Sequence, residues 1–310
     1  MDALSAFLEG PRARSAFVLR SILDPPWSLR IQDEAPLTLV AMVRSDAWIV
    51  PDTGRPERLG PGDLAILRGP DHYTVADDAA TSPQILIHPG QHCTTLDGES
   101  LAEAMHLGVR TWGTSIHGST IVLTGTYQTD GEISRRLVDA LPHLAVLRTD
   151  RWESPLIPLL ASEVVKEEPG QQVVLDRLLD LLLVAALRAW FGRPGADPPA
   201  WYGANGDPVV GPALRLIQND PAQPWTVAAL AADVGVSRAS LARRFHQLVG
   251  EPPMTFLANW RMALAADLLR EPGAVVGAVA RQVGYSSPFT FSTAFKRAYG
   301  VAPRDYRDAA

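Results

Sequence analysis

Residues 283–307 read VGYSSPFTFSTAFKRAYGVAPRDYR, a turn that leads into one short helix. Ser287 is placed to cap the free N–H groups at the start of this helix. Pro288 would occupy the first helical position, where its missing N–H costs nothing. Gly300 fits the left-handed conformation that commonly follows the end of a helix. The stretch therefore predicts a short capped helix that starts at Pro288 and stops at Gly300.

The same pattern occurs a second time, upstream, as LAADVGVSRASLARRFHQLVGEPP in residues 230–253. Leu241, Phe245 and Gly250 of this copy correspond to Phe291, Phe295 and Gly300 of the other. Each copy has a short helix, a turn with Gly and Ser, and a second helix, which is the pattern of a helix-turn-helix unit. The second helix of such a unit enters the major groove of DNA. We expect two units, at about residues 226–250 and 275–299.

Helical geometry, at about 100° per residue, divides each second helix into a core face and an exposed face. The expected core stripes are Leu241, Phe245 and Leu248 in the first unit and Phe291, Phe295 and Ala298 in the second. The opposite faces are expected to lie against DNA. The predicted DNA contacts are Arg238, Ala239, Ser240, Ala242, Arg243, Arg244 and His246, and then Ser287, Phe289, Thr290, Ser292, Thr293, Lys296 and Arg297.

Arg243 is the best candidate for reading a base, because an Arg side chain can donate two hydrogen bonds to guanine. Thr293 and Phe289 could contact thymine methyl groups. Contacts to phosphates position a protein on DNA without reading its sequence. We expect such contacts from Arg238, Arg244, Lys296 and Arg297. An ordinary solvated surface is the alternative for all of these side chains.

The C-terminal part, residues 209–310, resembles the DNA-binding domain of the AraC/XylS family of transcription regulators. The resemblance rests on the two units, on the tail Phe-Lys-Arg-x-x-Gly-x-x-Pro-x-x-Tyr-Arg, and on a long linking helix, PMTFLANWRMALAADLLRE, at residues 253–271. It implies a sequence-specific regulator that binds double-stranded promoter DNA. Residues 192–208, GRPGADPPAWYGANGDP, are crowded with Gly, Pro, Asp and Asn and predict a linker before this domain.

The N-terminal part holds short apolar runs separated by Pro, Gly and Asp turns, a pattern that predicts an antiparallel sandwich or barrel. The turn RLGPGDLAILRGPDH, residues 58–72, resembles the sensor cupins attached to this regulator family. We expect a cupin-like domain over residues 1–130 that binds an unknown small-molecule effector. Trp48 and His72 are candidates for its pocket, although each could also be plain core or surface.

A metal-dependent cupin enzyme fused to a DNA-binding domain is the alternative function. Such enzymes usually present a His-x-His pair, which this sequence lacks. Residues 88–93, HPGQHC, bring His88, His92 and Cys93 together, and with His72 they could bind zinc or copper. Cys93 could instead sense an oxidant, or the stretch could be a surface turn with an incidental thiol. We expect no metal, no cofactor and no catalysis.

Between the barrel and the linker, residues 131–191 are expected to form a helical segment that dimerises the chain. In QQVVLDRLLDLLLVAALRAWF, apolar residues recur at spacings of three and four. This helix could pack on its own barrel, or it could also form a homodimer interface through Leu175, Leu178, Leu182 and Ala185. The resulting fold class is a multidomain α+β protein: a cupin-like β-barrel with a helical dimerisation segment, followed by an all-α double helix-turn-helix domain.

Charge and composition agree with this organisation. The chain has a net charge of −6, yet residues 207–310 hold eleven Lys and Arg against eight Asp and Glu. The C-terminal part is therefore mildly basic and suited to a polyanion. The single cysteine excludes an internal disulfide and fits a reducing cytoplasm. No signal peptide and no membrane-spanning segment are expected.

Overall fold

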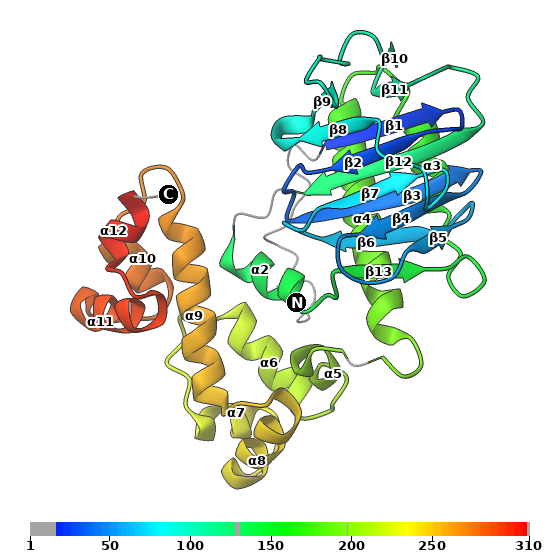
Figure 1. The fold of residues 1–310 in the computed structure, drawn as a ribbon. Coiled ribbons are helices and arrows are strands. Elements are labelled where there is room, and N and C mark those ends of the chain that lie inside the picture. Colours follow the sequence, from blue (N-terminus) through cyan, green and yellow to red (C-terminus); the bar gives the residue numbers. More distant parts are fainter. Residues whose placement is uncertain (1–16, 128–130, 197, 309–310) are drawn as a thin grey trace. The chain divides into compact units, whose positions relative to one another are not determined.

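The structure is a computed structural model that describes residues 17–127, 131–196 and 198–308 (Figure 1). Within these ranges the chain forms two compact units. One unit, called the sensor unit here, contains residues 17–127 and 141–196. The other, called the helical unit, contains residues 131–140 and 198–308. No helix among the described residues is long and apolar enough to cross a membrane.

The sensor unit is built from two β-sheets. The seven-stranded sheet has the order β10 (His106–Gly108), β11 (Thr111–Gly113), β1 (Phe17–Leu23), β12 (Thr120–Tyr127), β3 (Leu37–Arg44), β6 (Leu64–Arg68) and β13 (Leu144–Leu147). The six-stranded sheet has the order β5 (Glu57–Leu59), β4 (Ala47–Pro51), β7 (Tyr73–Ala76), β2 (Ser28–Ile31), β8 (Ile85–His88) and β9 (His92–Thr95). A short 3-10 helix, η1 (Pro89–Gln91), joins β8 to β9.

One hydrophobic core lies between these sheets. Val40 and Met42 of β3 and Ile49 and Val75 of the opposite sheet belong to the same buried cluster. Most strand pairs are antiparallel, while β1–β11 and β2–β8 are parallel. The expectation of a barrel or sandwich with many short strands is therefore confirmed.

Two helices, α3 (Leu156–Glu163) and α4 (Gln171–Gly192), pack on the seven-stranded sheet. The Tyr127 hydroxyl at the end of β12 donates to the Leu179 carbonyl at 2.8 Å. Gly125 of β12 makes the close approach possible, because a Cβ there would lie 2.8 Å from Leu179 Cδ2. The expected all-helical segment 131–191 is wrong at β13, a strand that pairs with β6.

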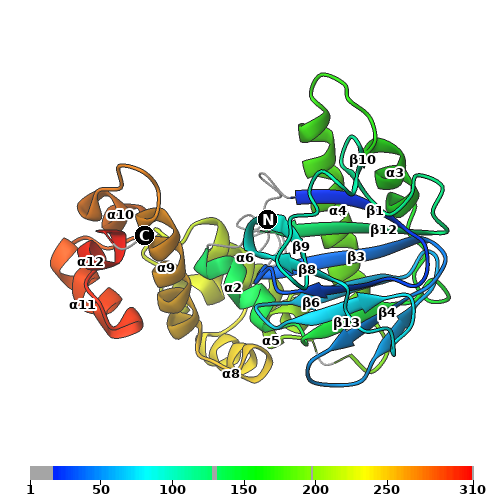
Figure 2. The same cartoon turned by 45° about the horizontal axis from the view of Figure 1, so that its top comes forward.

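The helical unit contains α2 (Glu132–Asp139) and all the helices after the sensor unit. These are α5 (Ala200–Ala204), α6 (Val210–Asn219), α7 (Val227–Asp233), α8 (Arg238–Val249), α9 (Pro253–Leu269), α10 (Val276–Gln282), α11 (Pro288–Tyr299) and α12 (Pro303–Asp308). Figure 2 shows α10, α11 and α12 at one end of α9 and α8 at the other. The predicted linker 192–208 is partly structured, since it includes α5.

The long helix α9 is shared by two separate hydrophobic cores. Phe256 and Leu257, near its start, pack with the residues of α6, α7 and α8. Met262 and Leu269, further along, pack with α10 and α11. Because one continuous helix contributes to both cores, it fixes the two helix-turn-helix units to each other, as the sequence predicted.

Candidate DNA-reading helices and ligand cavity

The two candidate reading helices, α8 and α11, begin and end as their sequences predict. The Ser237 hydroxyl accepts a hydrogen bond from the Ser240 N–H, and that of Ser287 accepts one from the Phe289 N–H, both at 3.2 Å. Gly250 and Gly300 follow the helices with positive φ values of 86° and 79°. The left-handed conformation costs Gly little, so each helix ends there.

The buried sides of these helices differ from the prediction at one position each. Leu241, Phe245, Phe291 and Phe295 are fully buried, as expected. Leu248 and Ala298 are exposed instead, and Val249 and Tyr299 pack against the cores. The buried stripe therefore continues four residues after Phe245 and Phe295, whereas the prediction used a spacing of three.

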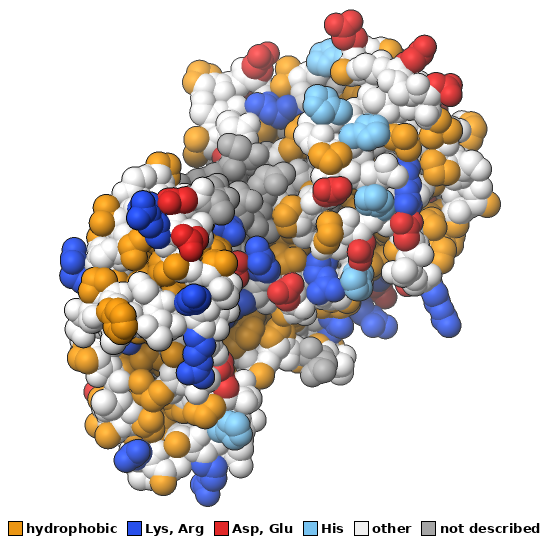
Figure 3. Space-filling view, turned by 60° about the vertical axis from the view of Figure 1, so that its left-hand side comes forward, with side chains coloured by type: hydrophobic (Ala, Val, Ile, Leu, Met, Phe, Trp, Pro, Cys, Tyr) orange, Lys and Arg blue, Asp and Glu red, His pale blue; other side chains and the backbone are white. Residues whose placement is uncertain are grey.

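The opposite faces of α8 and α11 are accessible. The exposed side chains are Arg238, Ala239, Arg243, Arg244, His246, Phe289, Thr290, Thr293, Lys296 and Arg297, and the half-buried ones are Ser240, Ala242, Ser287 and Ser292. Phe289 is 81% exposed. In Figure 3 the helical unit occupies the lower left, and Lys and Arg side chains recur along it. The predicted DNA contacts thus lie on accessible faces of the two helices.

Arg243 and Arg244 are neighbours in sequence but have different surroundings. The Arg244 guanidinium donates to the Asp207 carboxylate, at 2.9 Å from Nε and 2.7 Å from Nη2. This internal ion pair occupies Nε and Nη2 of Arg244, so the phosphate contact expected of Arg244 stays a prediction. No hydrogen bond or ion pair joins the Arg243 side chain to any described residue, so its donors remain available to DNA.

The hydroxyl groups of α11 are already engaged by its own backbone. Thr293 donates to the Phe289 carbonyl at 3.1 Å, Ser292 to that of Pro288 at 2.8 Å, and Thr290 to that of Ser287 at 2.9 Å. While these bonds persist, a hydroxyl can only accept a hydrogen bond from a base, and the Thr methyl groups can contact thymine.

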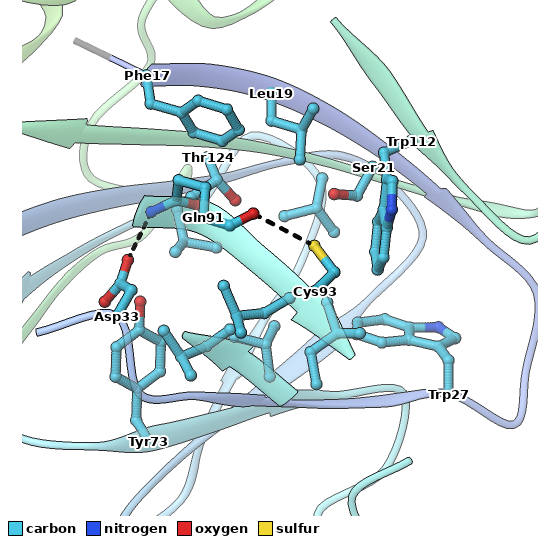
Figure 4. Close-up of a pocket in the computed structure, with 16 residues that line it drawn as sticks. Phe17, Leu19, Ser21, Trp27, Asp33, Tyr73, Gln91, Cys93, Trp112 and Thr124 are labelled. Carbon is cyan, nitrogen blue, oxygen red and sulfur yellow. Dashed lines mark hydrogen bonds between the residues drawn. The ribbon is translucent and has the colours of Figure 1, made fainter. Parts of the chain in front are cut away.

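A cavity of about 60 Å³ lies between the two sheets of the sensor unit (Figure 4). Aromatic side chains on its wall come from Phe17, Trp27, Tyr73 and Trp112, and aliphatic ones from β1, β2, β3, β7, β8 and β12. The polar lining residues are Ser21, Asp33, Gln91, Cys93 and Thr124. Such a largely apolar wall with a few polar groups is typical of a small-molecule site.

The polar groups of the cavity form one partial network. Gln91 Nε2 donates to the Asp33 carboxylate at 3.0 Å, and the Cys93 thiol lies 3.7 Å from the Gln91 carbonyl, to which it donates (Figure 4). Trp27 and Trp112 are 1% and 7% exposed, and their buried indole N–H groups have no hydrogen-bond partner among the described residues. A buried donor without a partner is costly to the fold.

Trp48 and His72, the predicted pocket residues, do not line this cavity. Successive residues of a strand point to opposite faces, and in β4 it is Ala47 and Ile49 that enter the core. Trp48 therefore faces away from the interior. His72 precedes β7, and its carbonyl accepts the Asp52 N–H at 3.4 Å.

The alternative metal set of His72, His88, His92 and Cys93 is also not assembled. Among the residues that the structure describes, no three His, Cys, Asp or Glu side chains form a group that could hold a metal ion. His92 and Cys93 are consecutive in β9, so they point to opposite faces. His88 Nε2 is hydrogen-bonded to the Thr94 hydroxyl at 2.9 Å.

Cys93 lies in the cavity wall with its thiol half-buried. Burial raises the pKa of the Cys93 thiol. Because the thiolate is the reactive form, a raised pKa makes the thiol slower to react with an oxidant at neutral pH. The cavity residues Asp33, Gln91, Trp27 and Trp112 were not singled out by sequence, since nothing local distinguishes them from core and turn residues.

Comparison with known families agrees with this geometry. The family described as Cupin matches residues 2–192, and a helix-turn-helix domain family matches residues 230–309. A putative AraC-like transcription regulator of Streptomyces lividans is 29% identical over 99% of this chain and 98% of its own length. The chain is an AraC-like transcription regulator with a cupin domain. The transcriptional regulators AlkR of Acinetobacter baylyi and MtrA of Neisseria gonorrhoeae are 28% and 25% identical over 99% of this regulator, and over 99% and 98% of their own lengths.

Proposed function

We propose that this regulator binds a small, largely apolar effector in the sensor cavity and reads promoter DNA through α8 and α11. The observation that carries the proposal is the cavity itself, which lies inside a domain fused to two helix-turn-helix units. The regulator acts without catalysis, in the cytoplasm, where its DNA is found. Binding of the effector shifts the regulator between two states only if its affinity for them differs.

The wall of the cavity defines the chemical class of the effector. Trp27, Trp112, Phe17 and Tyr73 favour a flat or aromatic molecule with little charge. The Asp33 carboxylate can accept a hydrogen bond from a ligand donor. An organic anion would meet the Asp33 carboxylate and no cation among the described residues of the wall, so anions are disfavoured.

A titration with small aromatic molecules tests this class. Indole, phenol and benzoate are added to the full chain while tryptophan fluorescence is recorded. We expect saturable quenching by indole and phenol, little by benzoate, and loss of the response in Trp112→Phe. Trp48→Phe is the matched control, since Trp48 lies outside the cavity and its removal leaves the response intact. The same quenching in the wild type and in both variants would argue against this effector class. An absence of quenching by all three molecules would also argue against it.

Metal analysis of the purified chain distinguishes the regulator from a cupin enzyme. Stoichiometric iron accompanied by turnover of a substrate would favour the enzyme. We expect DNA binding to be independent of chelators, because the three histidines and the cysteine of the alternative metal set are not grouped. Loss of DNA binding after treatment with a chelator, restored by a metal, would overturn this part of the proposal.

Two copies of the chain form a homodimer through the exposed side of α4. The predicted residues Leu175 and Leu182 are excluded from this role, because they are buried within their own sensor unit. The apolar stripe of this helix is wide enough to form two faces. Leu175 and Leu182 lie on the face that packs within the sensor unit. Leu178 and Ala185 are half-buried and lie beside the exposed Val174 and Leu181. This outer face, Val174, Leu178, Leu181 and Ala185, has the spacing of three and four that suits pairing with a second helix.

The two helix-turn-helix units of each chain would then contact two successive segments of the major groove. The two units are fixed to one helix, so α8 and α11 can address segments about one helical turn of DNA apart, roughly 34 Å. A dimer would place four reading helices on a promoter with two such elements. Selecting bound fragments from genomic DNA tests this arrangement, since the recovered sites should contain two paired elements.

A further inference from the structure

One side of α9 is covered by α2, a helix that the chain forms between two strands of the sensor sheet. Figures 1 and 2 show α2 beside α9. Asn259, Ala263 and Asp267 recur every four residues and so mark one stripe of α9. Ala263 is fully buried. This stripe is separate from the residues through which α9 enters the two helix-turn-helix cores.

Hydrogen bonds from the start and the middle of α2 hold it on this stripe. At its start, the Glu132 backbone N–H donates to Asp267 Oδ1 at 2.5 Å. A carboxylate is well placed there, because the first N–H groups of a helix have no partner within the helix. One turn later, Arg136 Nη2 donates to the Asn259 carbonyl at 3.1 Å. Gly131 permits the close approach, since a Cβ at that position would lie 3.1 Å from Asp267 Oδ2.

Charges around Arg136 add to this contact. Glu251, at the start of the segment that enters α9, accepts a hydrogen bond from Asn259 Nδ2 at 2.8 Å. Burial raises the pKa of Glu251, and its attraction to Arg136 offsets part of that rise. Arg136 thus approaches both the Asn259 carbonyl and the Glu251 carboxylate. At the start of α2, the Tyr306 hydroxyl of α12 donates to Glu132 Oε1 at 3.5 Å.

The strand that precedes α2 also forms part of the ligand cavity. Val122 and Thr124 of β12 line the cavity, and β12 ends at Tyr127, a few residues before α2 begins. After α2 the chain returns to the same sheet as β13. The chain thus leads directly from a strand of the cavity wall to a helix that is bonded to α9.

We propose that α2 is the element that couples occupancy of the sensor cavity to the DNA-binding helices. It binds the Asn259–Asp267 stripe of α9, and movement of β12 alters that contact. The contact leaves the exposed faces of α8 and α11 free, so α2 does not act by covering them. Coupling acts through α9, which fixes the two reading helices to each other. This inference rests on the proposed ligand site for its signal, whereas the docking of α2 can be tested without any ligand.

Hydrogen exchange of the full chain tests the docking. We expect Arg136→Glu, which places a negative charge near Glu251, to speed exchange of the Glu132 amide by about tenfold or more. The charge swap Arg136→Glu with Glu251→Arg should restore slow exchange. Arg135→Glu is the matched control, because Arg135 is an exposed neighbour that pairs only with Glu132 among the described residues. Equal exchange in wild type and Arg136→Glu would overturn the docking contact.

The coupling is tested by filling the cavity at its one cysteine. Methyl methanethiosulfonate converts the Cys93 thiol to a methyl disulfide with release of methanesulfinate, which places a small group in the cavity. We expect the label to change exchange in α9 of the wild type and not of Arg136→Glu, while Cys93→Ser remains insensitive to the reagent. A label confirmed by mass that leaves α2 and α9 unchanged would overturn the coupling.

Operator binding separates this inference from the proposed function. The coupling role predicts two results. The label changes the affinity of the wild type for selected genomic fragments, and it leaves the affinity of Arg136→Glu unchanged. If every variant responds alike, α2 is not the coupling element although the regulator still senses. If the wild type selects no DNA at all, the proposed function fails, whatever the exchange data show about α2.

Discussion

The Asp207 carboxylate binds the Arg244 guanidinium through Nε at 2.9 Å and Nη2 at 2.7 Å. The same carboxylate accepts the backbone N–H groups of Val209 and Val210, each at 2.9 Å. Asp207 therefore caps the start of α6 and holds the reading helix α8 against it. Of two consecutive arginines, Arg244 is held by an ion pair within the domain, whereas Arg243 has no bonded partner among the described residues.

Replacing Asp207 should destabilise the helical unit. Asp207→Ala removes the helix cap and the partner of Arg244, and we expect a loss of about 1–2 kcal/mol. The side chain of Arg244 is 45% exposed, so solvent limits the share that comes from the ion pair. Thermal unfolding of the full chain measures the change. Asp308→Ala is a suitable control, because Asp308 is an exposed partner of Arg304 and Arg307 at the end of α12.

The Asp207 carboxylate makes the stability of the helical unit depend on pH. Burial opposes ionisation of Asp207, but hydrogen bonds from Arg244 and from the Val210 and Val209 N–H groups outweigh it, and the pKa lies below its usual value. A carboxyl whose pKa is lowered by folding stabilises the fold above its unfolded pKa of about 3.9. That contribution is lost as the pH falls through the lower, folded pKa. The free energy of unfolding of Asp207→Asn should therefore be lower than that of the wild type at pH 6. The difference should shrink as the pH falls through the folded pKa of Asp207.

Substitutions of the two arginines should separate DNA reading from stability. Arg243→Ala is expected to weaken operator binding by about 1–3 kcal/mol and to relax the preference at one base pair. Its melting temperature should not change, because no described residue is bonded to its side chain. Arg244→Ala should lower the melting temperature while the base preference is kept. Competition binding against single-base operator variants gives the preference, and the same outcome for both variants would contradict the assignment.

Local chemistry made the reading helices predictable from sequence. The Ser caps, the terminal Gly residues and the repeated Leu or Phe positions depend on contacts within a few residues, and all were found where expected. The errors at Leu248 and Ala298 came from choosing a spacing of three over four at the last turn. The ion pair of Arg244 could not be predicted, because its partner, Asp207, lies 37 residues away in a segment that was taken for a linker.

The ligand cavity could not have been found in this way. Asp33 and Gln91 are hydrogen-bonded to each other but lie 58 residues apart. The predicted pocket residues were instead Trp48 and His72, of which only His72 belongs to the recognisable turn, and alternation along β4 turns Trp48 outward. Likewise, α2 has a helical pattern, yet nothing in its sequence indicates that it binds α9, since that contact joins residues more than one hundred positions apart.

Single substitutions on α4 should distinguish its outer face from its inner one. Leu181 is 52% exposed, whereas Leu182 is buried. We expect Leu181→Asp to convert the proposed homodimer to a monomer without loss of helix content, because only a partner helix would meet the new charge. Leu182→Asp buries a carboxylate in the sensor core and should unfold that unit. Sedimentation velocity and circular dichroism give the two readouts, and a Leu181→Asp protein that remains dimeric would place the interface elsewhere.

Phe289 offers the sharpest test of how α11 reads DNA. Its ring is 81% exposed on the second residue of the helix, where burial in the fold cannot explain a large apolar side chain. Contact with a thymine methyl group would remove this surface from water when DNA is bound. Phe289→Ala should therefore weaken operator binding by about 1–2 kcal/mol while thermal stability stays unchanged.

Replacing thymine by uracil tests that contact atom by atom, since uracil lacks only the methyl group. In the wild type, uracil at the contacted position should weaken binding by about the value of one buried methyl, roughly 1 kcal/mol. In Phe289→Ala the same replacement should have no effect, because the partner of the methyl is gone. Thr293→Ser is the companion variant, as it removes the other candidate methyl contact and keeps the hydroxyl that donates to the Phe289 carbonyl. A uracil penalty that persists in Phe289→Ala and disappears in Thr293→Ser would assign the thymine contact to Thr293.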